Sequence, residues 1–345
     1  ALLTAELLEA AKTREVVVVS SGAIALGVER LGYAARPKDI PGKQACAAVG
    51  QSRLMQAYEE AFGRGGRVVA QILLTHEDVQ DRRRYLNARH ALGRLLEERV
   101  IPIINENDTV SVSELKFGDN DTLAGLVGGL VEADLLVILS DVEGLYSADP
   151  RSQPDAKLID EVKDVTEEVI ALGGGAVSGV GTGGMATKVR AAARVAELGI
   201  RAVITSGQIP GRLRQVLAGE PVGTLFEPRA TRRSARTAWI AHALRAKGKL
   251  HVDDGARRAV LDLKKSLLPS GITRIEGSFS KGDPVDLVDP TGAAFARGLS
   301  AYDADELQRI AGKRTSEIEP ILGYRYLDEA VHRDDLAVLE AADSG

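Results

Sequence analysis

Residues 173–188 form the stretch best suited to chemistry, a glycine-rich segment that reads GGGAVSGVGTGGMATK. An apolar pattern with helical spacing follows it directly, so a loop leads into a helix. Glycines let backbone N–H groups converge on an anion, and a helix N-terminus adds unpaired donors and a partial positive charge. Thr182, Thr187 and Lys188 add two hydroxyls and one full charge. The segment is predicted to bind phosphate, although a flexible linker would have the same glycine content.

Two common nucleotide motifs do not describe this stretch. The P-loop motif needs a lysine at a fixed spacing, and none follows Gly184 where that spacing requires it. The dinucleotide motif GxGxxG fits poorly, because Lys188 stands where the helix must pack closely against its sheet. The sequence therefore predicts a phosphate-binding loop of another class.

Two clusters of amide and carboxylate residues form a second candidate site. Residues 105–108 read NEND after an apolar run, and residues 117–121 read FGDND before a helical pattern. Asparagine and aspartate favour turns and helix N-caps, but a cap needs only one such residue. This density of polar groups is typical of a site for an amino group, a metal or a polar small molecule. A lysine side chain is a further candidate partner.

An alternation of strands and helices positions these residues. Apolar runs predict strands over residues 16–19, 67–74, 100–104, 133–139 and 201–205. The pattern predicts an α/β fold of three layers, an open and mostly parallel sheet with helices on both faces. Ligands of such sheets bind at the carboxyl ends of the strands. Polar or glycine-rich residues stand at four of these ends, at Ser21, Asn105, Ser140 and Thr205.

Two interpretations of Ser21 remain open. Ser21 and Gly22 follow the first strand, so they stand at the expected ligand-binding edge. Ser21 is also suited to cap the helix expected over residues 23–31. Further helices are expected over residues 41–65 and 81–99, the second of them rich in arginine.

The chain of 345 residues is too long for one core, and its character changes after residue 227. The alternating pattern occupies residues 1–228, a basic helical connector is expected over 229–248, and short strands with close turns fill 249–345. This last segment is predicted to be a small β-rich domain with one helix over residues 303–311.

Charge and cysteine content narrow the function classes. Residues 249–345 hold 13 lysines and arginines against 18 aspartates and glutamates, while the preceding residues are balanced. Nucleic-acid binders usually carry a basic excess, so nucleic acid is not an expected partner. Cys46 is the only cysteine, and no apolar run could span a bilayer, so a cytoplasmic protein without membrane contact is expected. The five histidines lack metal-ligand spacing.

Together these motifs resemble the amino-acid kinase family over nearly the whole chain. The segments that carry the resemblance are residues 20–25, 81–89, 105–108, 118–121, 144–151 and 181–188. The last three recur loosely across the family. With a C-terminal domain that resembles a PUA domain, they indicate the branch that phosphorylates glutamate. The resemblance implies transfer of the γ-phosphoryl group of ATP to the side-chain carboxylate of L-glutamate, which opens proline synthesis.

The resemblance also implies roles for individual residues. Lys188 and Asp121 are implied as catalytic: Lys188 would stabilise charge on the transferring group, and Asp121 would orient lysines or support a Mg²⁺–phosphate assembly. No residue is implied as a direct metal ligand, since Mg²⁺ would arrive with ATP. Glutamate binding is implied for Ser21, Gly22, Asn105, Asp108, Asp119 and Asn120. ATP binding is implied for Ser140, Asp141, Tyr146, Asp149, Pro150, Thr182, Gly183, Gly184, Met185, Ala186, Thr187 and Lys188.

The resemblance further implies a homo-oligomer, a dimer or a tetramer, and feedback inhibition by proline. The family pattern begins with a strand and a Lys-Gly loop, whereas this sequence starts after that point. One sheet strand and one phosphate-binding lysine are therefore expected to be missing. Two alternatives stay open. One is an acetylglutamate kinase or an aspartokinase, which would not carry this C-terminal domain, and the other is RNA binding through that domain.

Overall fold

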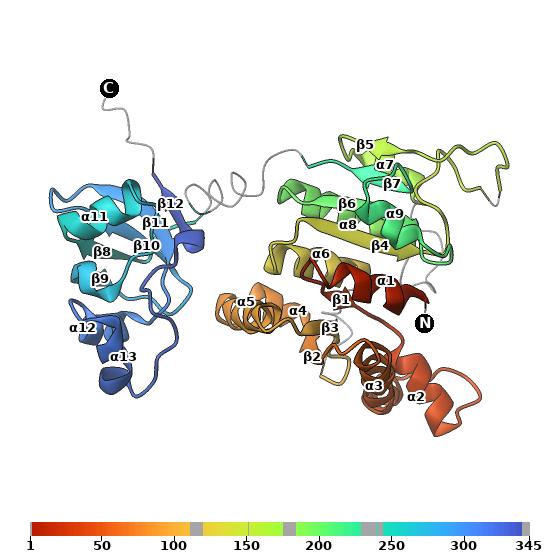
Figure 1. The fold of residues 1–345 in the computed structure, drawn as a ribbon, viewed down its shortest axis with the longest axis horizontal. Helices are drawn as coiled ribbons and strands as arrows, with labels where there is room; N and C mark the ends of the chain where they lie inside the picture. Colours follow the sequence, from red (N-terminus) through yellow and green to blue (C-terminus); the bar gives the residue numbers. More distant parts are fainter. Residues whose placement is uncertain are drawn as a thin grey trace. The chain divides into compact units, whose positions relative to one another are not determined.

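The computed structural model describes residues 2–110, 120–150, 152–174, 184–228, 240 and 244–339. Contacts along the chain divide it into two compact units, residues 1–232 and 233–345. Each unit has its own hydrophobic clusters. Figure 1 shows the helices and strands of both units along the chain. Most of the connector expected over residues 229–248 lies outside the described residues. The first strand of the second unit, β8, begins at Gly248.

The first unit holds two sheets where the sequence predicts one. A three-stranded sheet has the order β1-β3-β2, and a four-stranded sheet has the order β4-β6-β7-β5. All described pairs are parallel except β6 with β7. The mostly parallel α/β class is confirmed, but β1 and β4 are edge strands and do not pair with each other among the described residues. The strands are β1 (Val18–Val19), β2 (Val69–Leu74), β3 (Ile101–Glu106), β4 (Leu135–Ser140), β5 (Glu161–Val162), β6 (Arg201–Ser206) and β7 (Thr224–Phe226).

Helices cover both faces of the three-stranded sheet. Residues of α5 and α6 pack on one face, and residues of α1 and α3 pack on the other. Every residue of β3 is buried, with Ile103 on the α3 side and Ile104 on the α6 side. Burial on both faces explains why this strand reads as a nearly continuous apolar run. The helices are α1 (Leu2–Ala10), α2 (Ala23–Leu31), α3 (Ile40–Gly63), α4 (His76–Gln80), α5 (Arg82–Glu97), α6 (Asn120–Leu130), α7 (Glu167–Leu172), α8 (Met185–Glu197) and α9 (Arg212–Leu217).

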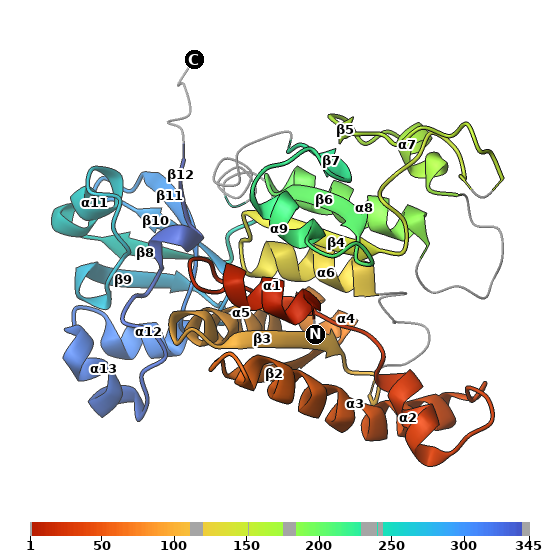
Figure 2. The ribbon, with the colours of Figure 1, turned by 45° about the vertical axis from the view of Figure 1, so that its right-hand side comes forward.

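Helix α6 links the two sheets, because it contacts β1 and β3 of one sheet and β4 of the other. Figure 2 shows α6 running beside β4. Helix α8 packs on β4 and β6, with Val189 and Val195 fully buried. Helix α1 makes a further link, since the Glu6 carboxylate accepts hydrogen bonds from the N–H groups of Gly211 (2.9 Å) and Arg214 (3.1 Å) at the start of α9.

Helices α2 and α3 approach each other closely through two glycines. A Cβ atom on Gly50 would lie 1.7 Å from the Ala23 carbonyl oxygen, and one on Gly27 would lie 1.8 Å from the Cys46 carbonyl oxygen. Neither position can hold a side chain unless the helices move apart. The contact fixes the start of α2 against the middle of α3, and it buries Cys46 completely.

The second unit is a five-stranded sheet in the order β12-β11-β10-β8-β9, in which only β8 and β10 are parallel. The expected β-rich character is confirmed, but the expectation of one helix is wrong. Helices α11 and α13 accompany α12, and sequence patterns missed them because α11 is short and charged while α13 contains Pro320. The elements are β8 (Gly248–Val252), α11 (Asp254–Leu261), β9 (Ile272–Gly277), β10 (Pro284–Val288), β11 (Ala294–Leu299), α12 (Ala304–Ile310), α13 (Thr315–Leu322) and β12 (Leu336–Val338).

Tyr302 anchors the core of the second unit. Its side chain is fully buried, and its hydroxyl accepts hydrogen bonds from the N–H groups of Tyr326 (3.2 Å) and Leu327 (3.0 Å). Burial raises the pKa of the Tyr302 phenol above its ordinary value. In neither unit is a described helix long and apolar enough to cross a membrane.

Candidate active site

Three segments bring amide groups together at the carboxyl end of β3. Ser20 continues the pairing of β1, since its N–H donates to the Ile104 carbonyl at 2.9 Å. Asn105 is 3% exposed, and its Oδ1 accepts a hydrogen bond from Asn120 Nδ2 at 3.1 Å. The same Asn120 Nδ2 donates to the Ser20 carbonyl at 2.5 Å. Asn120 Oδ1 has no partner among the described residues, so this group is an available acceptor.

The second half of the site is an ion pair between α6 and α8. Lys188 Nζ donates to both carboxylate oxygens of Asp121, at 2.8 Å and 3.0 Å, and both side chains are about 85% buried. Thr187 Oγ1 lies 3.0 Å from the same carboxylate. Asn120 and Asp121 are consecutive residues in the first turn of α6, so one turn of helix serves both halves of the site.

Small residues allow α6 and α8 to run side by side in the same direction. A Cβ atom on Gly125 would lie 3.3 Å from the Ala191 carbonyl oxygen, and one on Gly128 would lie 3.2 Å from Val195. With the Asp121–Lys188 pair, these contacts place both helix N-termini together. Each N-terminus contributes a partial positive charge and unpaired N–H groups, so the pair favours an anion.

The two ends of the glycine-rich segment meet at the start of α8. The Ala186 N–H donates to the Gly173 carbonyl at 3.1 Å, and Gly184 is the N-cap residue of α8. A Cβ atom on Gly173 would lie 2.6 Å from the Ala186 nitrogen, so only glycine permits this closure. Residues 175–183, including the predicted Thr182 and Gly183, lie outside the described residues. The described ends of the segment therefore lie at the N-terminus of α8.

The predicted nucleotide residues of β4 stand at the carboxyl end of the second sheet. Ser140 pairs with Ser206 of β6, and its Oγ lies 3.2 Å from Asp141 Oδ1. Tyr146 forms an isolated bridge with Leu158, and the Asp149 carbonyl accepts two backbone N–H groups of its own turn. Pro150 is exposed in the same turn. The part of these residues in a nucleotide site stays a prediction.

The structure revises the local setting of several predicted residues. Gly22, with φ of 105°, is the N-cap residue of α2, and the start of this helix has no side-chain cap. The interpretation of Ser21 as the N-cap is therefore wrong. Ser21 is exposed beyond the strand end, and Asp108 follows β3 by two residues. Asn105 lies within β3 and Asn120 within α6, whereas both were expected to flank these elements. Asp119 lies outside the described residues.

Comparisons with known proteins identify the family of this chain. Residues 3–206 match the amino acid kinase family, and residues 248–322 match the PUA domain. A glutamate 5-kinase of Myxococcus xanthus is 71% identical over 97% of this chain and 89% of its own length. Glutamate 5-kinases of Anaeromyxobacter dehalogenans and Syntrophotalea carbinolica are 54% and 53% identical, over 99% and 94% of this chain and 90% and 87% of their own lengths. The chain belongs to the amino acid kinase family.

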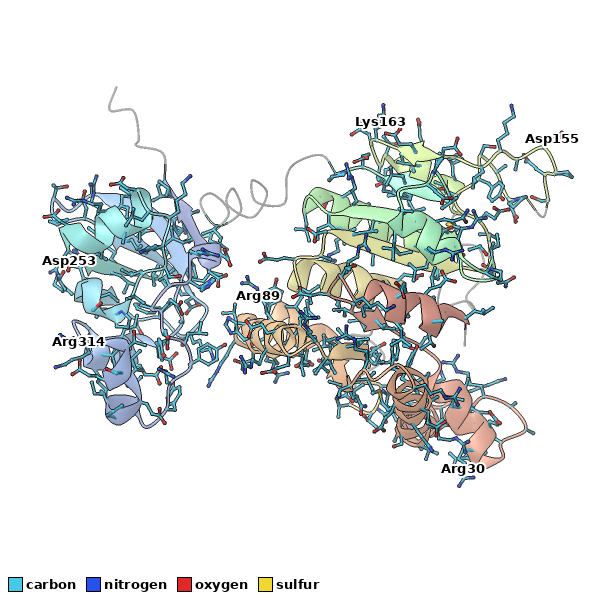
Figure 3. All side chains as sticks on the ribbon, in the orientation of Figure 1. Arg30, Arg89, Asp155, Lys163, Asp253 and Arg314 are labelled. Atoms are coloured by element: carbon cyan, nitrogen blue, oxygen red, sulfur yellow. The ribbon has the colours of Figure 1, made fainter. Side chains whose placement is uncertain are left out.

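Sequence analysis missed two site contacts, because both come from helical positions that resemble a solvent-exposed face. In this amino acid kinase, Gln51 of α3 accepts a hydrogen bond from Asn105 Nδ2 at 2.9 Å. Tyr58, two turns further along α3, has its hydroxyl 2.7 Å from Ser20 Oγ. The arginine-rich helix α5 makes a structural contact instead: Arg89, labelled in Figure 3, pairs with Glu132 at 2.7 Å and so ties α5 to the end of α6.

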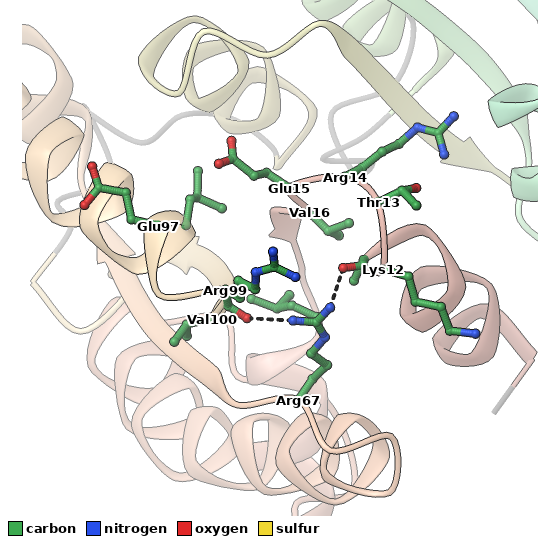
Figure 4. A pocket seen from close by; sticks show the side chains of 12 residues that line it. Lys12, Thr13, Arg14, Glu15, Val16, Arg67, Glu97, Arg99 and Val100 are labelled. Carbon is green, nitrogen blue, oxygen red and sulfur yellow. Dashed lines mark hydrogen bonds between the residues drawn. The ribbon is translucent and has the colours of Figure 1, made fainter.

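A cavity of about 330 Å³ lies at the opposite, amino ends of the strands of the first sheet. Arg67 precedes β2 by two residues. Its side chain crosses this cavity and donates to the Ala11 and Arg99 carbonyl oxygens at 2.5 Å and 3.4 Å (Figure 4). None of the predicted site residues lines it. In amino acid kinases, as in other open α/β folds, ligand chemistry belongs to the carboxyl ends, so this cavity is separate from the candidate active site.

An ATP-dependent kinase uses a divalent metal. The side chains near the candidate active site can therefore be compared with the ligands that such a metal needs. Within the described ranges, no three histidine, cysteine, aspartate or glutamate side chains come together as a ligand set. A divalent metal that is held mainly by water and by substrate phosphates needs only one or two protein carboxylates. Asp121, next to the predicted phosphate loop, is a carboxylate placed to support it. When bound, the metal supplies charge neutralisation on the triphosphate.

Proposed function

We propose that this chain transfers the γ-phosphoryl group of ATP to the side-chain carboxylate of L-glutamate. The observation that carries the proposal is the first turn of α6. Its Asn120 faces the amide cluster of β3, and its Asp121 holds Lys188 at 2.8 Å. The names of the glutamate 5-kinase relatives support the substrate assignment.

The amide cluster is suited to an amino-acid acceptor. Asn120 uses its Nδ2 on Asn105 and on the Ser20 carbonyl, so its Oδ1 remains to accept from an ammonium group. Ser21 and Asp108 come from neighbouring strand ends and add a hydroxyl and a carboxylate. These groups would hold glutamate by its α-amino and α-carboxylate groups and leave its side-chain carboxylate for the reaction.

The Lys188 side is suited to the phosphoryl group. Phosphoryl transfer depends on positioning and on stabilising charge that spreads over the transferring oxygens. Lys188, the N-terminus of α8 and the glycine-rich loop supply that charge and those donors. Asp121 orients the Lys188 ammonium, because both of its oxygens contact Nζ. Residues Ser140 and Asp141 are proposed to border the nucleotide.

The reaction needs no catalytic base. A glutamate side-chain carboxylate is already ionised at neutral pH and can attack phosphorus without losing a proton. The bond from the γ-phosphorus to the β–γ bridging oxygen breaks as the acyl phosphate forms, and ADP leaves. A site of amides, hydroxyls, carboxylates and one lysine, without histidine, is sufficient for this chemistry.

The acceptor is tested by measuring ADP release in a coupled assay of the full chain with ATP and Mg²⁺. We expect ADP release to depend on glutamate, and not on N-acetylglutamate or aspartate. Turnover that is faster with either alternative acceptor would assign the chain to another branch of the family.

Replacing Asn120 by alanine tests the acceptor site. Loss of a hydrogen bond to a charged ammonium costs about 1.5–3 kcal/mol, so glutamate KM should rise about 10- to 100-fold. ATP KM should change less than about twofold, since the hydrogen bonds of the Asn120 side chain to described residues all belong to the amide cluster. Steady-state kinetics with each substrate varied in turn measure both values. An unchanged glutamate KM would remove Asn120 from the site.

Several finer properties stay predictions from the family resemblance. These are Mg²⁺ as the metal, assembly into a dimer or tetramer, inhibition by proline and a cytoplasmic location. Nucleic acid is not proposed as a partner. The second unit is acidic, and its cavity of about 580 Å³ is lined by Asp253, Asp254 and Asp289 as well as by Arg274.

A further inference from the structure

Gln51 is a buried polar residue with an unusual environment. It lies in the middle of α3 and is 8% exposed, among buried neighbours that are otherwise small or apolar. Its Oε1 accepts from Asn105 Nδ2 at 2.9 Å, while its Nε2 is buried and has no hydrogen-bond partner among the described residues. A buried donor without a partner destabilises a fold. Leucine or methionine at this position would remove that unpaired donor but leave the buried Asn105 Nδ2 without its acceptor, so stability alone does not select glutamine.

Two backbone groups fix the direction of the hydrogen bonds around Gln51. The Glu106 N–H, which can only donate, lies 2.9 Å from Asn105 and requires Oδ1 there. The Ser20 carbonyl, which can only accept, lies 2.5 Å from Asn120 and requires Nδ2 there. Asn105 Nδ2 must then face Gln51, which has to offer its oxygen. The arrangement leaves Gln51 Nε2 unpaired, and it leaves Asn120 Oδ1 as the free acceptor.

Helix α3 therefore holds both partners of Asn120. Gln51 holds Asn105, whose Oδ1 receives one hydrogen bond from Asn120. Tyr58 lies seven residues further on, which places it on the same face of α3. Its hydroxyl bonds Ser20 Oγ at 2.7 Å, and the Ser20 carbonyl receives the other hydrogen bond from Asn120.

We propose that Gln51 and Tyr58 are positioning residues for the amino-acid acceptor, acting through Asn105 and Ser20 to aim Asn120 Oδ1 at its ammonium group. The proposal rests on the acceptor site described under the proposed function. It assigns a substrate-specific task to one face of α3, a helix with no predicted site residue. ATP binding does not depend on this face, because Lys188 and Ser140 lie on α8 and β4.

The test replaces Gln51 by methionine, which has a similar length and no hydrogen-bonding amide. We expect glutamate KM to rise about tenfold, the effect of about 1.4 kcal/mol of lost interaction, with ATP KM within about twofold of wild type. Tyr58→Phe, which removes one hydroxyl, should raise glutamate KM about threefold in the same selective way. Tyr58→Phe also keeps the proposal testable if Gln51→Met does not fold.

Gln56→Met is the matched control, because Gln56 is an exposed glutamine of the same helix and its Nε2 donates to Glu60 Oε1 at 3.1 Å, away from the amide cluster. It should leave both KM values unchanged. A purely structural role for Gln51 would raise both KM values together, and that result would overturn the proposal. If Asn120→Ala raises glutamate KM but Gln51→Met does not, the role of Gln51 alone is wrong. If neither variant changes it, the acceptor site itself is wrong.

Discussion

Replacing Lys188 by methionine is expected to lower kcat about 10²- to 10³-fold while glutamate KM stays within a few-fold of wild type. Removing one preorganised charge donor from a transition state typically costs about 3–4 kcal/mol. Lys188 is about 85% buried and has its ammonium aligned by both oxygens of Asp121, so little reorganisation is needed when charge develops. Methionine keeps the packing of the aliphatic chain and removes only the charge.

Stopped-time measurements of ADP formation over a range of glutamate concentrations separate the two parameters. Lys163 offers a matched control, because it is an exposed lysine of the same unit whose Nζ lies 3.9 Å from Glu161 (Figure 3). Lys163→Met should have wild-type kinetics. A wild-type kcat for Lys188→Met would exclude Lys188 from the phosphoryl site, and a rise in glutamate KM alone would move it to the acceptor side.

Replacing Gly50 by alanine is expected to destabilise the first unit by about 3 kcal/mol, at the upper end of overpacking effects. The new Cβ would lie 1.7 Å from the Ala23 carbonyl oxygen, which is backbone and cannot rotate away. The helices α2 and α3 must therefore separate by more than 1 Å, as any ordinary carbon–oxygen contact exceeds 3 Å. Because Gln51 is the next residue and α2 starts at Ala23, glutamate KM should rise as well.

Urea unfolding followed by circular dichroism measures the loss of stability. Gly63→Ala is the control on the same helix, since nothing lies within 4 Å of a Cβ atom at Gly63. Alanine has the higher helix propensity, so this control should be neutral or stabilising by up to about 1 kcal/mol. Equal unfolding midpoints for the Gly50 and Gly63 variants would show that the α2–α3 contact adjusts without cost.

Local patterns in the sequence predicted β1, β2, β3, β4 and β6 of the first unit and the polar residues at their ends, but they missed the short strands β5 and β7. Buried parallel strands such as β3 are apolar on both faces, so their position is evident from composition alone. The boundaries were less accurate, because Asn105 is polar and yet belongs to β3. Its burial depends on partners that are distant in sequence, 15 residues away at Asn120 and 54 away at Gln51.

The separation into two sheets and the role of α3 could not be predicted in the same way. Whether β1 and β4 pair with each other depends on how the other strands and helices of the unit place them. Local sequence patterns do not contain that information. A glutamine in an amphipathic helix is usually exposed, so Gln51 carries no signal of its own. From the sequence, a lysine was one of several candidate partners for the acidic clusters. The parallel packing of α6 and α8 is what brings Lys188 to Asp121.

The adjacency of Asn120 and Asp121 has a consequence for redesigning acceptor preference. Successive residues of an α-helix project about 100° apart, so the two side chains are directed to different neighbours by the rotational phase of α6 alone. Inserting or deleting a single residue after Asp121 would turn both side chains by about 100° in the same sense relative to the rest of the helix, so at most one of them could still face a site partner. Specificity can therefore be changed by substitution within α6, whereas a one-residue change of length next to Asp121 would separate the two tasks.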